Sequence, residues 1–137
     1  MTDHAAQLAA RWLARARSDL SIAGKLLADR ANDEAWAAAF HGQQAAEKAI
    51  KAILTSTRTD FPKTHDLARL MDLLPANPPV PTSADDLEWL SYFGTAGRYV
   101  MDDVMAGSEP GWEDAAQAFR LAEEILDWAR DEAERQG

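Results

Sequence analysis

Two groups of polar side chains on one predicted helix are the first candidates for chemistry in this sequence. A helix turns by about 100° per residue, and on a wheel of residues 34–55 Gln43 and Glu47 fall inside an otherwise apolar face. A buried carboxylate is costly unless a cation and hydrogen bonds compensate it. We therefore expect Gln43 and Glu47 to form a buried polar network, with Arg98 or Arg17 as the cation beside Glu47. Such a network either fixes the register of the helix or lines a polar pocket.

The second group is a polar stripe on the same segment. It consists of His41, Gln44, Lys48 and Lys51, which follow one another at spacings of three, four and three residues. The wheel places this stripe opposite the apolar face. Two ammonium groups, an amide and an imidazole suit a phosphate or a nucleotide. The alternative is an ordinary solvated helix face without a ligand.

Several classes of catalytic site are missing from the sequence. There is no cysteine, so thiolate chemistry and cysteine-ligated metals are excluded. The three histidines lie in different segments and none follows a Glu-x-x-His pattern, so we expect no metal site and no cofactor. There is no G-x-S-x-G motif, no P-loop and no glycine-rich dinucleotide turn.

Histidine, arginine, lysine and carboxylates therefore remain for any catalysis. A histidine can take or give a proton near neutral pH, and an arginine can stabilise phosphate charge. This inventory fits RNA cleavage.

The elements that must position these residues are all helical. Apolar residues recur at three- and four-residue steps, which is the period of an amphipathic helix. The pattern predicts helices over residues 2–28, 34–55, 65–74, 83–101 and 112–134. Expected N-caps are Asn32 or Asp33 for the second helix, Thr64 for the third, and Ser83, with Asp86 three residues on, for the fourth.

No segment shows the alternation of a strand. The predicted fold is thus an all-α, up-and-down bundle of four main helices plus one short helix, with residues 1–137 as a single domain. The four prolines between residues 75 and 81 form a stiff connector within it.

Charge is distributed unevenly along the chain, whose net charge is -9. Residues 1–68 hold nine Lys and Arg against eight acids, whereas residues 69–137 hold five against fifteen. The overall charge makes double-stranded DNA an unlikely ligand, although a local basic face could still attract an anion. The sequence shows no signal-peptide pattern and no apolar run long enough for a membrane span, so we expect a cytoplasmic protein that does not bind membranes.

Four stretches of the chain together resemble one known family. They are ARSDLSIAGKLL, FHGQQAAEKAIKAIL, FPKTHDLARLMDLLP and EDAAQAFRLAEEILDW, with GRYV at residues 97–100 as a further match. From about Ala14 to Arg130 the sequence is similar to the HEPN domain, the higher eukaryote and prokaryote nucleotide-binding family. The FHxQQAAEKAIKAxL run followed by THDL is the most specific part of the likeness.

This resemblance implies a helical bundle that is usually a homodimer and interacts with nucleotides or RNA. Many members are metal-independent ribonucleases, and several are toxins paired with a minimal nucleotidyltransferase. The ribonucleases carry Arg, four to six residues, then His. Arg98 stands where the family's arginine is expected but no His follows it, whereas Arg58 and His65 have the spacing in a loop that contains Pro62. Under this resemblance His65 and Arg98, which could approach each other in the fold, are the catalytic candidates. The alternative function is a catalytically inert homodimer that acts as an adaptor for a partner.

The predicted homodimer interface rests on apolar residues outside the main stripes. Leu121 and Trp128 lie off the apolar stripe of the last helix, and Trp89 stands beside the stripe of the fourth. Tryptophan is enriched where proteins meet. We expect these three side chains at or near the interface between two copies.

Overall fold

The computed structural model describes residues 3–31, 33–75, 80–96 and 109–136. The helices of these residues are α1 (His4–Asp29), α2 (Ala35–Ser56), α3 (Leu67–Asp72), α4 (Ala84–Ala96) and α5 (Trp112–Gln136). The described residues are mostly helical and contain no strand, so the prediction of an all-α bundle with four longer helices and one short helix is confirmed.

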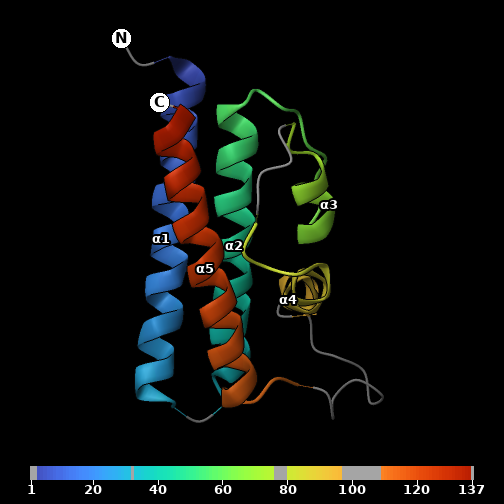
Figure 1. The fold of residues 1–137 in the computed structure, drawn as a ribbon. Coiled ribbons are helices and arrows are strands. Elements are labelled where there is room, and N and C mark those ends of the chain that lie inside the picture. Colours follow the sequence, from blue (N-terminus) through green and yellow to red (C-terminus); the bar gives the residue numbers. More distant parts are fainter. Residues whose placement is uncertain (1–2, 32, 76–79, 97–108, 137) are drawn as a thin grey trace.

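Three long helices lie side by side and form the body of the molecule (Figure 1). α1 runs antiparallel to α2, and α5 runs in the same direction as α2 and packs against both. α4 departs from the up-and-down arrangement, because it runs across the long helices, with α3 beside it. α2 is central, since it packs against each of the other four helices.

Small residues allow α2 to lie this close to its neighbours. A Cβ at Gly42 would stand 3.3 Å from the backbone of Ala118 on α5. A Cβ at Gly94 of α4 would stand 2.5 Å from the side chain of Gln43. These two glycines therefore bring the backbones of α5 and α4 against α2.

Side-chain caps start most of the helices. Asp3 Oδ1 accepts from Ala6 N at 2.7 Å at the start of α1. The predicted cap at Ser83 is confirmed, because its Oγ accepts from Asp86 N at 3.1 Å. The predicted cap at Thr64 is wrong: Asp66 caps the third helix by accepting from Arg69 N at 3.1 Å.

Two other predicted helix ends differ from the structure. α2 begins after Glu34 without a side-chain cap, so Asp33 does not cap it, and Asn32 lies outside the described residues. α3 is also shorter than the predicted residues 65–74, because its cap, Asp66, already has an extended backbone. The predicted continuation of the fourth helix over residues 97–101 lies outside the described residues.

The hydrophobic core draws on all five helices, and its largest fully buried apolar side chains are Ile50, Ile53, Leu54, Leu67, Leu70, Leu90 and Ile125. Leu121 and Trp128 belong to this core, with 5% and 8% of their surfaces exposed. Their predicted place on an exposed dimer interface is therefore wrong, because the wide apolar arc of α5 faces helices of its own subunit. Trp89 is half-buried and packs against Phe93, with ring centroids 4.9 Å apart.

Membrane insertion finds no support in the described part of the chain. None of its helices combines the length and the apolar composition that a bilayer span needs.

Candidate functional site

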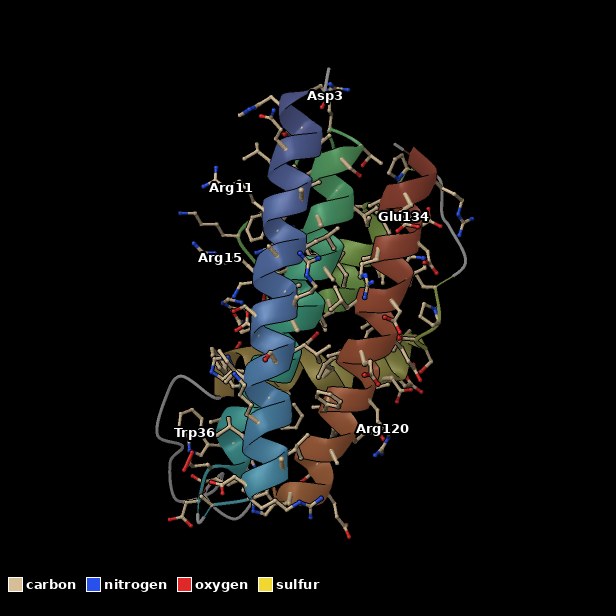
Figure 2. The ribbon with its side chains drawn as sticks, turned by 90° about the vertical axis from the view of Figure 1, so that its left-hand side faces the viewer. Asp3, Arg11, Arg15, Trp36, Arg120 and Glu134 are labelled. Carbon is tan, nitrogen blue, oxygen red and sulfur yellow. The ribbon has the colours of Figure 1, made fainter. Side chains whose placement is uncertain are left out.

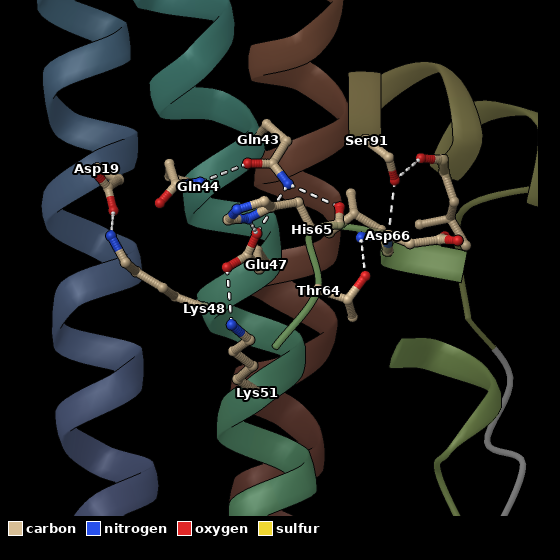
Figure 3. Close-up of polar contacts among 12 residues, drawn as sticks. Asp19, Gln43, Gln44, Glu47, Lys48, Lys51, Thr64, His65, Asp66 and Ser91 are labelled. Atoms are coloured by element: carbon tan, nitrogen blue, oxygen red, sulfur yellow. Dashed lines mark hydrogen bonds and ion pairs between the residues drawn. The ribbon is translucent and has the colours of Figure 1, made fainter. Parts of the chain in front are cut away.

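A carboxylate and a histidine meet on the side of α2 that faces the loop before α3. Glu47 lies in the middle of α2 and is 4% exposed. His65 comes from that loop, and its Nδ1 lies 2.7 Å from Glu47 Oε1 (Figure 3). Because the carboxylate accepts, Nδ1 carries the proton and Nε2 is left available for other partners. The side chain of His65 is 34% exposed, so solvent reaches the ring.

Two glutamines connect the Glu47 carboxylate to the backbone of His65 through hydrogen bonds. Gln43 Nε2 lies 3.2 Å from Glu47 Oε1 and 3.3 Å from the backbone carbonyl oxygen of His65. Gln44 Nε2 donates to Gln43 Oε1 at 2.8 Å, which fixes the orientation of the Gln43 amide. The sequence expectation of a buried network at Gln43 and Glu47 corresponds to this arrangement, and the loop carbonyl is an additional member.

The cation of the network is Lys51. Its Nζ donates to Glu47 Oε2 at 2.9 Å. It also lies 5.7 Å from the ring centroid of Trp12 and 5.5 Å from that of Phe61, within cation–π range of both. Lys51 is thus the cation that the described residues place beside Glu47, where we expected Arg98 or Arg17. Arg17 is exposed on α1 and does not pair with Glu47, and Arg98 lies outside the described residues.

Glu47 is ionised in this environment. Burial raises the pKa of its carboxyl group, but hydrogen bonds from His65 and Lys51, the charge of Lys51 and the hydrogen bond from Gln43 together outweigh burial. The net result is a pKa below the ordinary value of 4.5. A charged Glu47 can therefore orient the imidazole of His65 at any pH near neutrality.

A second cluster of the same composition lies between α1 and α2. Asp19 of α1 is 7% exposed, and its Oδ1 lies 2.8 Å from His41 Nδ1. Its Oδ2 accepts from Lys48 Nζ at 2.5 Å. Each cluster thus joins one carboxylate to one histidine and one lysine. The sequence analysis did not select Asp19, although its position three residues after Ala16 and four before Ala23 places it on the buried side of α1.

The polar stripe of α2 is not an open basic face. Gln44 is buried at 7% exposure, Lys48 is bound to Asp19 and Lys51 is bound to Glu47. The prediction that these residues lie opposite the apolar face is wrong, because helices or loops cover α2 on several sides and both of its lysines meet buried carboxylates. Exposed cations near this stripe include Arg11 and Arg15 on α1, which point away from α5 (Figure 2).

His65 also lines an open cavity of about 650 Å³. One wall is the segment from Thr64 to Ala68 at the start of α3, and the other is one face of α4. Ser91 ties the two walls together, because its Oγ accepts from Leu67 N at 2.8 Å and donates to the Leu87 carbonyl oxygen at 2.7 Å. The full lining is Thr64, His65, Asp66, Ala68, Ala84, Glu88, Ser91, Tyr92 and Thr95.

The loop motif of Arg58 and His65 is not assembled into one site. Arg58 Nη2 pairs with Asp3 Oδ2 at 3.2 Å, and Arg58 lines a different cavity from His65. The described residues also contain no group of three or more acidic or histidine side chains that could hold a metal ion.

Comparison with known proteins matches the chain to one family. The model of the HEPN domain matches residues 9–132 of 137. Comparison with curated proteins and with solved structures returns no match.

Proposed function

The chain belongs to the HEPN domain family, and from that premise we propose that it interacts with RNA and cleaves it without a metal ion, with His65 as the acid–base residue. Membership of this family supports a nucleotide- or RNA-related role at the level of the family. The single observation that carries the finer proposal is the 2.7 Å contact between His65 Nδ1 and the buried, ionised carboxylate of Glu47. Carboxylate–histidine pairs orient the imidazole and fix which nitrogen is free.

The reaction follows from the free nitrogen. Nε2 of His65 takes the proton of a ribose 2′-hydroxyl, and the 2′-oxygen attacks the adjacent phosphorus. The bond from phosphorus to the 5′-oxygen breaks, and the protonated imidazole returns its proton to that leaving oxygen. Glu47 is a positioning residue in this scheme. Arg98, known only from the sequence, is proposed to stabilise the charge on the phosphate.

Labelled single-stranded RNA in the presence of EDTA provides the test. We expect the wild-type protein to cleave it and His65→Ala to lose at least about 100-fold in rate, which is the lower end of what general acid–base catalysis contributes. Arg98→Ala should lose activity as well. His4→Ala is the matched control, because His4 is exposed on the first turn of α1 and lies in a different cavity from His65. Cleavage by His65→Ala at the wild-type rate would contradict the proposal.

The same proposal extends to partners. We propose a homodimer, and pairing with a minimal nucleotidyltransferase as in a toxin–antitoxin system. Light scattering should give a mass near twice 15.1 kDa. A nucleotidyltransferase reading frame beside the gene and co-purification of its product would support the pairing. A protein that stays monomeric at high concentration would contradict the homodimer. A protein that does not bind such a nucleotidyltransferase would contradict the pairing.

One observation favours the alternative of a catalytically inert adaptor. Gln43, Gln44, Glu47 and Lys48 all have partners inside the fold, as structural ties between helices would. If the clusters are structural only, His65→Ala should lower the melting temperature while wild-type protein shows no RNA cleavage at all. Loss of cleavage at an unchanged melting temperature would instead assign His65 to catalysis.

A further inference from the structure

The two walls of the cavity beside His65 differ chemically. His65 stands on one wall, and the α4 wall presents Glu88, Tyr92 and Thr95 along one helix face, at spacings of four and three residues. Its volume of about 650 Å³ lies within the range of about 300–1,000 Å³ that is common for small-molecule sites. The cavity therefore has room for one nucleoside unit next to the imidazole.

Tyr92 provides a surface on which a flat ring can stack. It is 36% exposed, and its ring meets Phe93 edge-to-face with centroids 5.5 Å apart. This contact fixes the ring while leaving part of it in the cavity. Stacking on an aromatic side chain is how proteins hold unpaired bases, and it does not by itself distinguish one base from another.

Glu88 is the group that can distinguish bases. The other carboxylate of the lining, Asp66, uses Oδ1 to cap α3. Glu88 is exposed, and no hydrogen bond or ion pair engages it within the described residues. Both of its oxygens can therefore accept. A carboxylate that accepts two parallel N–H groups matches guanine, which presents N1–H and an N2 amino group side by side. Adenine, cytosine and uracil each place at least one acceptor on the corresponding edge, which would face the carboxylate.

Electrostatics orient such a ligand. Glu88 repels phosphate from the α4 wall, whereas the opposite wall carries His65 and, beside it, Asp66, one of whose oxygens already caps α3. A nucleotide with its base on Tyr92 thus directs its phosphate toward His65.

We propose that this cavity is a guanine-selective base pocket, in which Tyr92 stacks on the base and Glu88 accepts from N1–H and the N2 amino group. The proposal rests on the proposed function, since it names the nucleotide next to the phosphate on which His65 acts. It assigns cleavage, where it occurs, to RNA positions beside guanosine.

Calorimetric titration of the full chain with GMP, AMP, CMP and UMP at low salt tests this pocket without requiring any cleavage. We expect GMP to bind about tenfold or more tightly than each of the others, in line with the discrimination of a bidentate base contact. Glu88→Gln should abolish that preference, because an amide offers one acceptor and one donor. Tyr92→Leu should weaken all four nucleotides alike, and Tyr92→Phe should retain binding.

Glu124→Gln on the exposed side of α5 is the matched control and should leave all affinities unchanged. Three results would overturn the pocket assignment. They are equal affinity for the four nucleotides, a GMP preference that survives in Glu88→Gln, and binding of arginine amide in place of nucleotides. Absence of nucleotide binding would overturn it as well. RNA cleavage without guanosine preference would refute the pocket and leave His65 as the acid–base residue. Selective GMP binding without RNA cleavage would support the pocket and refute the catalytic role of His65.

Discussion

Glu47 is the residue on which the site depends, and its charge links stability to pH. Its folded-state pKa lies below the ordinary value of 4.5, so the unfolded chain binds this proton more readily than the folded chain does. The stabilisation is therefore complete above the ordinary pKa and is lost as the pH falls through the folded-state pKa. Replacing Glu47 by Gln leaves Lys51 without its anion, and we expect a loss of about 1–3 kcal/mol at pH 7.

Chemical denaturation of wild-type protein and Glu47→Gln at pH 7 and pH 3 measures this effect. The difference between the two proteins should be large at pH 7 and should shrink as the pH falls toward 3, because protonation of the wild-type carboxyl group removes the charge that pairs with Lys51. Glu124→Gln, at an exposed site on α5, should match the wild type at both values. A difference that stays constant with pH would show that the charge of Glu47 does not stabilise the fold.

The polar residues also show which parts of the site a sequence can predict. The wheel places Glu47 in an apolar face, and a buried carboxylate requires a cation. Lys51 could have been predicted as that cation, because it follows Glu47 by four residues and such pairs are neighbours on a helix. His65 as the second partner could not be derived in this way. It reaches Glu47 only because the loop after α2 folds back along that helix, and such packing depends on contacts distant in sequence.

At the scale of elements, the crossing of α4 over α2 is set by a glycine. A Cβ at Gly94 would stand 2.5 Å from the side chain of Gln43, which is fully buried and bound to Glu47 and the His65 carbonyl oxygen. Gly94→Ala must therefore move Gln43 or the α4 backbone. We expect a loss of about 1–3 kcal/mol in unfolding free energy, together with a fall in any activity that depends on His65.

Thermal melting and the RNA assay test this prediction side by side. Gly111→Ala is the control, since a Cβ at Gly111 has nothing within 4 Å. If Gly94→Ala is as stable and active as that control, the contact between Gly94 and Gln43 does not position the site. The helices themselves were predictable from apolar periodicity, whereas this crossing was not, because glycine spacing alone does not reveal which neighbour comes close.

Across the whole molecule, the charge asymmetry of the sequence becomes an asymmetry in space. Arg11 and Arg15 stand on the side of α1 that faces away from α5 (Figure 2). Exposed acids follow α5 on the other side, at Glu123, Glu124, Asp127, Asp131 and Glu134. Because Lys48 and Lys51 are already paired with buried carboxylates, long-range attraction of RNA falls to exposed cations such as these two arginines.

We therefore expect single-stranded RNA to bind along the side of α1 that carries Arg11 and Arg15, with an affinity that falls as salt is added. Each phosphate contact contributes about 0.7 to the slope of log affinity against log salt for single strands. The double variant Arg11→Gln with Arg15→Gln should weaken binding and reduce that slope by about 1.4. Filter binding of a labelled oligonucleotide over a salt series measures both quantities.

Arg120→Gln, which removes an exposed arginine from α5, should leave the affinity and the salt slope unchanged, because that arginine stands among carboxylates that repel the strand. An equal effect of both changes would mean that RNA responds only to the net charge of the protein and not to one side of it.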